Sequence, residues 1–385
     1  MTRQIIGKIH LWVGLALCIP LVIIGLTGSV LVFEDELQGA TTGRAAASGI
    51  ARPVAEIVAA ARTAAPAGYL AATYVAPAEA GAMASVRLVP PQRDAPSFDA
   101  IRVRVDPVTL TAAIDRQDGL LRQIFFLHST LLLKNRNGRQ TVGWLGVVML
   151  AMGLSGLINW WPLRGQWGSA FAMTRGARGF RLHRELHGAA GIWGLIVFIT
   201  VSFAGVYLTF PEAVRGLVDL VLPSRDFRAQ AAALRVSPVT GAEPIDIDAA
   251  IALALAEYPG ARASFVFLPT RPDRPFRIAV LRAEQDRGAP TITVIVDQGS
   301  RRVIETFDPR QFSLGERILA WQHALHAGQA LGWVWKVLVF LSGLLPLLFA
   351  LTGPTMWWLK RRRRSKHAAE DLATSQASTV GRAAE

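Results

Sequence analysis

Cysteine is almost absent from this sequence, since Cys18 is the only one among 385 residues. A single thiol excludes an intrachain disulfide, a Cys-x-x-Cys-His haem attachment and thiolate metal sites. The chain also lacks Gly-x-Gly-x-x-Gly. The segment His183-Arg-Glu-Leu-His187 has its glutamate at the third position, so it is not the zinc protease motif His-Glu-x-x-His. Neither a dinucleotide-binding loop nor a zinc protease helix is indicated.

Charge is also scarce, and its distribution predicts a membrane protein. Charged residues make up 18% of the chain, against about 25% in a typical soluble protein. Residues 9–33, 141–161, 188–210 and 337–359 contain no Asp, Glu, Lys or Arg. Each segment is long enough to cross a hydrocarbon core of about 30 Å, which takes roughly 20 helical residues. A cleaved signal peptide is the alternative for the first segment, but its apolar core would be shorter, about 7–15 residues.

The basic residues indicate how the chain is oriented. The sequence has 41 Lys and Arg against 28 Asp and Glu, a formal net charge of +13. Arg3 and Lys8 precede the first apolar segment, five arginines lie between the second and third, and a basic cluster over 360–366 follows the fourth. Four crossings put all three clusters on one side, which the positive-inside rule identifies as the cytoplasm. We therefore expect both termini in the cytoplasm, a lipid bilayer around the spans, and no nucleic-acid partner.

The two halves of the chain carry the same pattern, which indicates a tandem repeat. The first and third apolar segments have matching residues at equal spacing: His10, Gly14, Gly28 and Phe33 in one, and His187, Gly191, Gly205 and Phe210 in the other. The second and fourth also match: Leu127-His128, Ser155-Gly156 and Trp160-Trp161 in one, and Leu325-His326, Thr352-Gly353 and Trp357-Trp358 in the other. Two halves in the same orientation imply a pseudo-twofold axis along the membrane normal.

The segments outside the predicted spans repeat as well. Residues 52–116 and 244–308 each read as a helix, Pro53–Ala65 or Ile247–Tyr258, followed by alternating strand-like runs. We therefore expect four transmembrane α-helices as two parallel tandem repeats, with an α+β module in the periplasm in each half. The expected boundaries are 9–33 for the first span, 34–120 for the first outer module, 121–161 for an outer-face histidine segment and the second span, 162–186 for a cytoplasmic basic loop, 187–210 for the third span, 211–312 for the second outer module, 313–359 for a second histidine segment and the fourth span, and 360–385 for a basic, disordered cytoplasmic tail.

Paired histidines are the main functional signal. The repeat brings His10 together with His187 near the cytoplasmic face, and His128 together with His326 near the outer face. Two imidazoles from facing helices are the axial ligands that a six-coordinate b-type haem requires. We therefore expect two haem b groups per chain, with these four histidines on the haem iron. Three alternatives remain open: interfacial histidines bonded only to headgroups or carbonyls, ligation by the neighbouring His183 and His323, and a site for a metal or substrate iron at His323 and His326.

Small residues and cations agree with a haem site. At about 100° per residue, Gly14 and Gly28 share the helix face of His10, and Gly191 and Gly205 share the matching face of the third span. These glycines would admit a flat macrocycle, although close helix packing through small residues is the alternative. Haem propionates need cationic partners, and the candidates are Lys134, Arg136, Arg139, Arg181 and Arg184.

In order and spacing these motifs resemble the PepSY-associated transmembrane proteins, iron-regulated bacterial inner-membrane proteins that include ferric-siderophore reductases. The resemblance rests on His10-x-x-x-Gly14, Leu127-His128-Ser129, Leu186-His187-x-x-x-Gly191-Ile192-Trp193, Leu325-His326-Ala327-Gly328 and Trp357-Trp358. It implies two PepSY-like modules and a haem-containing oxidoreductase that passes electrons outward to ferric siderophore and releases the iron. Some relatives look to carry a fused flavin domain. Because this sequence has no Gly-x-Gly-x-x-Gly, we expect a separate cytoplasmic or membrane electron donor.

Two other classes of function compete with the reductase. A non-redox siderophore permease would bind the same substrate, but the predicted spans have no midplane charge of the kind that ion-coupled carriers commonly use. A PepSY-type regulatory membrane protein would act through its outer modules, and it leaves the paired histidines unexplained. No arrangement of residues for acid or base catalysis is evident, so no catalytic side chain is expected.

Overall fold

The computed structural model describes residues 2–41, 49–77, 79, 81–91, 100–115, 119–133, 137–163, 165–237, 244–285 and 288–382. The chain divides into two compact units. The helical unit comprises Met1–Val32, Ile124–Phe210 and Val334–Glu385, and the sheet unit comprises Phe33–Gln123 and Pro211–Trp333.

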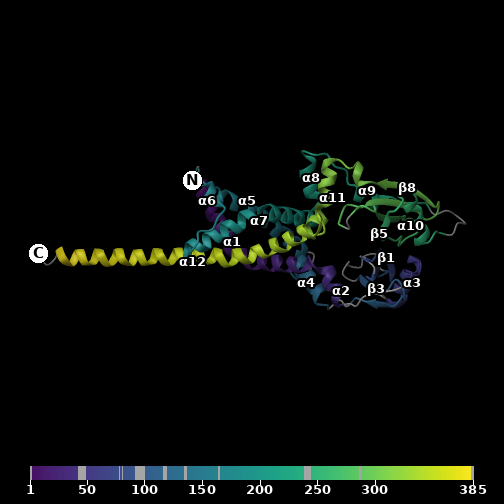
Figure 1. Ribbon diagram of the computed structural model, residues 1–385, viewed down its shortest axis with the longest axis horizontal. Coiled ribbons are helices and arrows are strands. Elements are labelled where there is room, and N and C mark those ends of the chain that lie inside the picture. The colour runs from purple at the N-terminus through teal and green to yellow at the C-terminus, as the bar shows by residue number, and fades with distance from the viewer. Residues whose placement is uncertain are drawn as a thin grey trace. The chain divides into compact units, whose positions relative to one another are not determined.

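Four long apolar helices dominate the helical unit, and among the described residues they are the candidates for crossing a membrane (Figure 1). They are α1 (Thr2–Leu31), α5 (Asn137–Trp160), α7 (Gly179–Thr209) and the first part, Gly332–Ser365, of α12 (Gly332–Arg382). Each covers nearly all of one uncharged segment. Large apolar side chains remain exposed on their surfaces, for example Ile196 at 78% and Ile19 at 70%. Such a surface is suited to lipid rather than to water, and the chain is a membrane protein.

The helix α12 is longer than its apolar segment. The sequence predicts a disordered tail over 360–385, but α12 continues as a helix to Arg382, so this prediction was wrong. The residues after Leu359 include many strong helix formers, such as Lys, Arg, Ala, Glu and Leu. Extending a helix that has already formed avoids the cost of nucleation, which explains why a polar segment can remain helical.

Close backbone contact joins α1 to α12 within the helical unit. A Cβ added at Gly343 would lie 2.6 Å from the carbonyl oxygen of Gly25, and one added at Gly25 would lie 3.0 Å from Cγ of Pro346. Beside them, the Ser29 hydroxyl donates to the carbonyl oxygen of Phe340, 2.8 Å away. Because a side chain would force the backbones apart, glycine is required at this crossing.

The sheet unit contains one eight-stranded antiparallel sheet with two helices on one face. The strands are β1 (Leu70–Val75), β2 (Ala84–Val89), β3 (Ile101–Val105), β4 (Ala112–Ile114), β5 (Arg262–Phe267), β6 (Phe276–Leu281), β7 (Ile292–Asp297) and β8 (Arg302–Phe307), in the order β4-β3-β2-β1-β5-β6-β7-β8. The helices α3 (Val54–Ala64) and α10 (Ile247–Ala256) share one core with side chains such as Val86 and Ile278, both fully buried. Alternate residues point to the other face.

The two halves of this sheet have the same internal register. Tyr74 of β1 pairs with Val266 of β5 at the junction. Matching register shifts lie between Ala71 and Thr73 in β1 and between Ala263 and Phe265 in β5. The sequence predicts α3, α10 and strand-like runs that end at Asp106 and Asp297, so it missed β4 and β8, which follow those residues, and the single sheet that unites the halves. The three-residue β4 is too short to show a pattern, and pairing between distant strands has no local signal.

Shorter helices lie between these elements along the chain. They are α2 (Glu34–Thr41), α4 (Leu120–Thr130), α6 (Trp167–Ala170), α8 (Pro211–Asp219), α9 (Phe227–Ala233), a 3-10 turn (Pro309–Gln311) and α11 (Leu314–His326). The helix α11 begins with a capping box, in which Ser313 Oγ accepts from the Glu316 N–H and the Glu316 carboxylate accepts from the Ser313 N–H. Arg225 donates to the same carboxylate at 2.7 Å.

Candidate functional site

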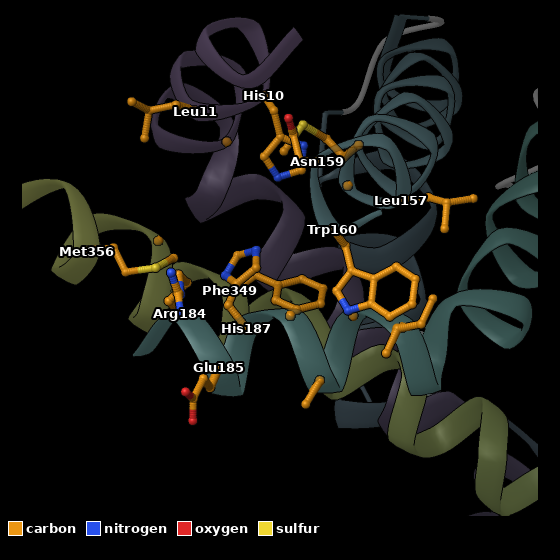
Figure 2. Close-up of a pocket in the computed structure, with 18 of the residues that line it drawn as sticks. His10, Leu11, Leu157, Asn159, Trp160, Arg184, Glu185, His187, Phe349 and Met356 are labelled. Carbon is orange, nitrogen blue, oxygen red and sulfur yellow. The ribbon is translucent and has the colours of Figure 1, made fainter. Parts of the chain in front are cut away.

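His10 on α1 and His187 on α7 point toward one another in the helical unit (Figure 2). Their ring centres are 6.3 Å apart, and the ring planes make an angle of 71°. The two residues hold matching positions in the two halves of the sequence. The structure therefore brings together the two histidines that the sequence predicts as the cytoplasmic pair.

A hydroxyl from a neighbouring helix orients each of these rings. Ser155 Oγ on α5 lies 2.8 Å from Nδ1 of His10, and Thr352 Oγ1 on α12 lies 2.8 Å from Nδ1 of His187. Each hydroxyl also donates to a carbonyl oxygen of its own helix, at 3.2 Å for Ser155 and 2.8 Å for Thr352. Since a hydroxyl has one hydrogen to donate, both contacts are satisfied only when Nδ1 carries the imidazole proton. In that tautomer Nε2 keeps its lone pair and can bind a metal.

A cavity of ≈ 840 Å³ surrounds the two rings, a size typical of sites for cofactors and other small molecules. Gly14 and Gly191 lie in its wall. A Cβ added at Gly14 would lie 3.2 Å from Cε of Met152, and one at Gly191 would lie 3.9 Å from Phe349. The Phe349 ring also contacts His187, with ring centres 4.6 Å apart. Both glycines therefore lie in the cavity wall beside the histidines, and their role in admitting a macrocycle stays a prediction.

Cationic side chains stand at the same cavity, and they differ in what they already bind. Arg3 donates to two backbone carbonyl oxygens at 2.6 and 2.9 Å, and Arg181 donates to Glu185 at 2.7 Å. Arg184, labelled in Figure 2, makes no hydrogen bond or ion pair with any described residue, and Lys360 completes the group. Of the predicted propionate partners in this region, Arg184 is the one whose guanidinium is available.

The neighbouring histidine of α7 is placed differently. His183 is not in the cavity wall, and its buried Nδ1 has no hydrogen-bond partner among the described residues. Of the two alternatives on this helix, His187 is therefore the one positioned to bind a group in the cavity.

His128, on α4, contacts the other end of α1. Its Nδ1 lies 3.0 Å from the carbonyl oxygen of Ile24 and 3.3 Å from the Thr27 hydroxyl. A carbonyl oxygen only accepts hydrogen bonds, so the contact with Ile24 requires the proton on Nδ1 and leaves the lone pair on Nε2. A Cβ added at Gly28 would lie 2.9 Å from Cε1 of His128. The space beside Gly28, expected to admit a macrocycle, is filled by this imidazole because α4 folds back against α1.

The remaining predicted site residues belong to separate regions. His326, half-buried, and His323, exposed, lie on α11 of the sheet unit, whereas His128 lies in the helical unit, so the outer histidine pair stays a prediction. Gly205 is half-buried on α7, and its role also stays a prediction. Lys134 and Arg136 lie outside the described residues, and Arg139 donates to the carbonyl oxygen of Leu208.

Sequence reasoning missed the hydroxyl groups that orient the two rings. Ser155 and Thr352 serve in the sequence comparison only as markers of the repeat, each followed by glycine. Their matching positions on the second and fourth spans were the available signal, because a repeat that places two histidines also places their partners. Phe349 has no equivalent signal, since its contact with His187 depends on the packing of α7 against α12.

The comparisons with known proteins agree with this architecture. No match was found among curated proteins. A family model described as the PepSY-associated TM region matches residues 8–360, a stretch that reaches into all four long helices and includes the entire sheet. The chain therefore belongs to the family of proteins with a PepSY-associated transmembrane region.

Proposed function

We propose that this protein is a haem b-containing reductase of the bacterial inner membrane, which moves electrons from the cytoplasmic side to the periplasm and reduces ferric siderophore there. The convergence of His10 and His187, each with its Nε2 lone pair available, carries the proposal. The substrate is Fe³⁺ held by hard oxygen ligands. One electron from a separate donor converts it to Fe²⁺, which such ligands bind less strongly, and the iron is released.

The geometry of the two rings fits an iron centre with two imidazole ligands. The ring centres are 6.3 Å apart, and a metal-bound imidazole nitrogen lies about 2.0 Å from its metal, so His10 and His187 would each offer a ring nitrogen to the same metal ion. No group of three or more His, Cys, Asp or Glu side chains gathers within the described residues to hold a bare metal ion. Two nitrogen donors alone suit an iron that brings four ligands of its own, as in a porphyrin.

The surrounding residues suit the same group. His10 and His187 would hold the haem iron, Gly14 and Gly191 would make room for the macrocycle, and Arg184 would pair with a propionate. When bound, haem b supplies a one-electron couple within an apolar part of the membrane. The protein's task is to hold both imidazoles correctly turned, which Ser155 and Thr352 would do by accepting from Nδ1. No side chain has to transfer a proton.

The charges around the cavity support its orientation. Arg3, Arg184 and Lys360 line it, and basic residues near the ends of spans collect on the cytoplasmic side. This side would therefore receive electrons, with both termini inside and the sheet unit in the periplasm. His128 contacts α1 at Gly28, roughly 27 Å along the helix axis from His10 at 1.5 Å per residue. A second haem with His128 and His326 as its ligands stays a prediction from the repeat.

An optical spectrum with haem quantification tests the proposal. We expect full-length protein, purified in detergent from haem-replete cells, to show a low-spin bis-imidazole spectrum that sharpens on reduction with dithionite. His10→Ala and His187→Ala should each lose this signal from the inner site. His183→Ala, on the same helix but away from the cavity, is the matched control and should retain it. Colourless wild-type protein would overturn the proposal.

Activity in vesicles separates the reductase from its competitors. With the donor dithionite trapped inside proteoliposomes, ferric siderophore outside should yield Fe²⁺ that a ferrous chelator captures. Uptake of intact siderophore by haem-free protein would instead support a permease. A cellular function that survives His10→Ala and His187→Ala would support a regulatory protein.

A further inference from the structure

A second cavity, of ≈ 290 Å³, lies in the sheet unit near the junction of the two halves of the sheet. Ala72 of β1, Phe267 of β5 and Arg277 of β6 line it, together with Ala231 at the end of α9 and Arg274 in the loop before β6. Phe267 pairs with Arg277 across β5 and β6. Arg277 alternates along β6 with the buried Phe276 and Ile278, so it points away from the core shared with α3 and α10.

The Arg277 guanidinium is positioned by an aromatic ring rather than by an acid. Its Cζ lies 3.9 Å from the centre of the Phe267 ring. The Arg277 guanidinium forms no hydrogen bond or ion pair with any described residue. Stacking uses the face of the guanidinium plane and leaves its N–H groups, which lie in the plane, free to donate. A half-buried cation with unused donors at the wall of a cavity is suited to bind an oxyanion.

The neighbouring charges do not neutralise this cation. Arg274 uses one N–H to bind the carbonyl oxygen of Ala232 at 2.6 Å, and its positive charge remains. Burial lowers the pKa of Arg277, and the nearby Arg274 lowers it further. The acid beside them, Asp273, is already bound by Arg271 at 2.9 Å and by Arg235 at 3.5 Å. The positive charges of Arg274 and Arg277 repel each other, and a bound anion would reduce this repulsion.

We propose that this pocket binds carboxylate groups of a small organic anion, with Arg277 and Arg274 as the binding cations and Phe267 as an apolar wall. Resting on the proposed function, the inference names the substrate class of the reductase as an anionic, carboxylate-bearing chelate of ferric iron. Arginine suits this ligand because its fork of N–H groups matches the two oxygens of a carboxylate.

Binding of gallium(III) citrate to the full-length protein in detergent tests the inference. Gallium(III) has the charge of ferric iron but is not readily reduced, so binding is measured without electron transfer. We expect saturable binding by calorimetry that weakens as salt is raised. Arg277→Gln and Arg274→Gln should each weaken it at least about tenfold, and Arg277→Lys should restore it only in part. Arg262→Gln, a change of equal charge on the exposed start of β5, should bind as wild type does.

The results distinguish this inference from the proposed function. A gallium(III) trihydroxamate without negative charge should bind no more weakly to Arg277→Gln than to wild type. If wild type fails to bind gallium(III) citrate, or if both arginine variants bind it normally, the inference is wrong even where haem is present. If Arg262→Gln lost as much binding as the pocket variants, the binding of gallium(III) citrate would depend only on the net charge of the protein. That result would also overturn the inference. Haem measured in the same samples reports separately on the reductase.

Discussion

Ser155 accepts a hydrogen bond from Nδ1 of His10, and the matching residue Thr352 accepts one from Nδ1 of His187, both at 2.8 Å. Removing either hydroxyl should leave its ring able to turn and to change tautomer. We expect Ser155→Ala and Thr352→Val to weaken haem retention by about 10-fold to 100-fold, as loss of a partner to a metal-bound histidine does. Haem retained after dialysis against apomyoglobin, together with the midpoint potential, measures the effect.

The conservative exchanges provide the control for these two positions. Ser155→Thr and Thr352→Ser keep a hydroxyl at each ring and should preserve both haem retention and midpoint potential. If the alanine and valine variants behave as wild type does while His10→Ala loses haem, the hydroxyls do not position the rings.

His128 should hold a second haem. Its Nδ1 is engaged by the Ile24 carbonyl oxygen, so Nε2 is the ring nitrogen that would bind the iron. We expect His128→Ala to lower the haem content from about two to about one per polypeptide, measured by pyridine haemochrome assay. Ser129→Ala, which removes a hydroxyl of a half-buried side chain on the same helix, should keep both. An unchanged haem content in His128→Ala would limit the protein to one haem, at the inner site.

Gly343 should be intolerant of any side chain. A methyl group there would lie 2.6 Å from the Gly25 carbonyl oxygen, so α12 would have to move away from α1. We expect Gly343→Ala to destabilise the helical unit by about 1–3 kcal/mol, seen as a lower midpoint of thermal unfolding in detergent. Gly353→Ala, also on α12, meets no atom within 4 Å and should have little effect on that midpoint. Equal midpoints for the two variants would contradict the close approach.

Glu316 should make the sheet unit sensitive to acid. Hydrogen bonding from Arg225 lowers the pKa of this carboxyl to about 2 from its ordinary value of 4.5, with the Ser313 N–H contributing. Because the folded pKa is the lower one, the stabilisation is complete above about pH 4.5 and is lost as the pH falls toward 2. We expect Glu316→Gln to cost about 1–3 kcal/mol at pH 7 and much less near pH 3, measured by thermal unfolding.

An exposed ion pair provides the comparison for Glu316. Glu284 binds Arg310 while both side chains are more than half exposed, so Glu284→Gln should change stability by less than about 1 kcal/mol at either pH. A Glu316→Gln effect that stayed the same between pH 7 and pH 3 would mean that its charge does not contribute.

Features that depend on residues close together in the sequence could be predicted from it, whereas most contacts between distant elements could not. The four spans follow from uncharged segments, and α3 and α10 follow from local periodicity. The approach of His10 to His187 also follows from sequence, because a repeat relates positions that are far apart in the chain. The hydroxyl partners were not predicted, since which helix neighbours each histidine depends on packing. The helical tail of α12 was missed because composition was considered without the helix that precedes it.

The arginine pocket shows a second kind of limit. Arg277 and Phe267 are ten residues apart, and nothing in their spacing suggests that one stacks on the other. Their contact arises because the register of β5 against β6 places them opposite one another. Only the folded sheet shows that Arg277 has no acidic partner among the residues that the structure describes.

The pairing of Tyr74 with Val266 has a consequence for how such a chain can be divided. Either half expressed alone would leave β1 or β5 as a bare edge, with a row of backbone donors and acceptors that invites aggregation. Two copies of one half, meeting edge to edge, would cover that row in the same antiparallel manner as a symmetric dimer does. When both halves are linked in one polypeptide, the pairing of β1 with β5 no longer depends on protein concentration. Each half can then also change in sequence without changing the other.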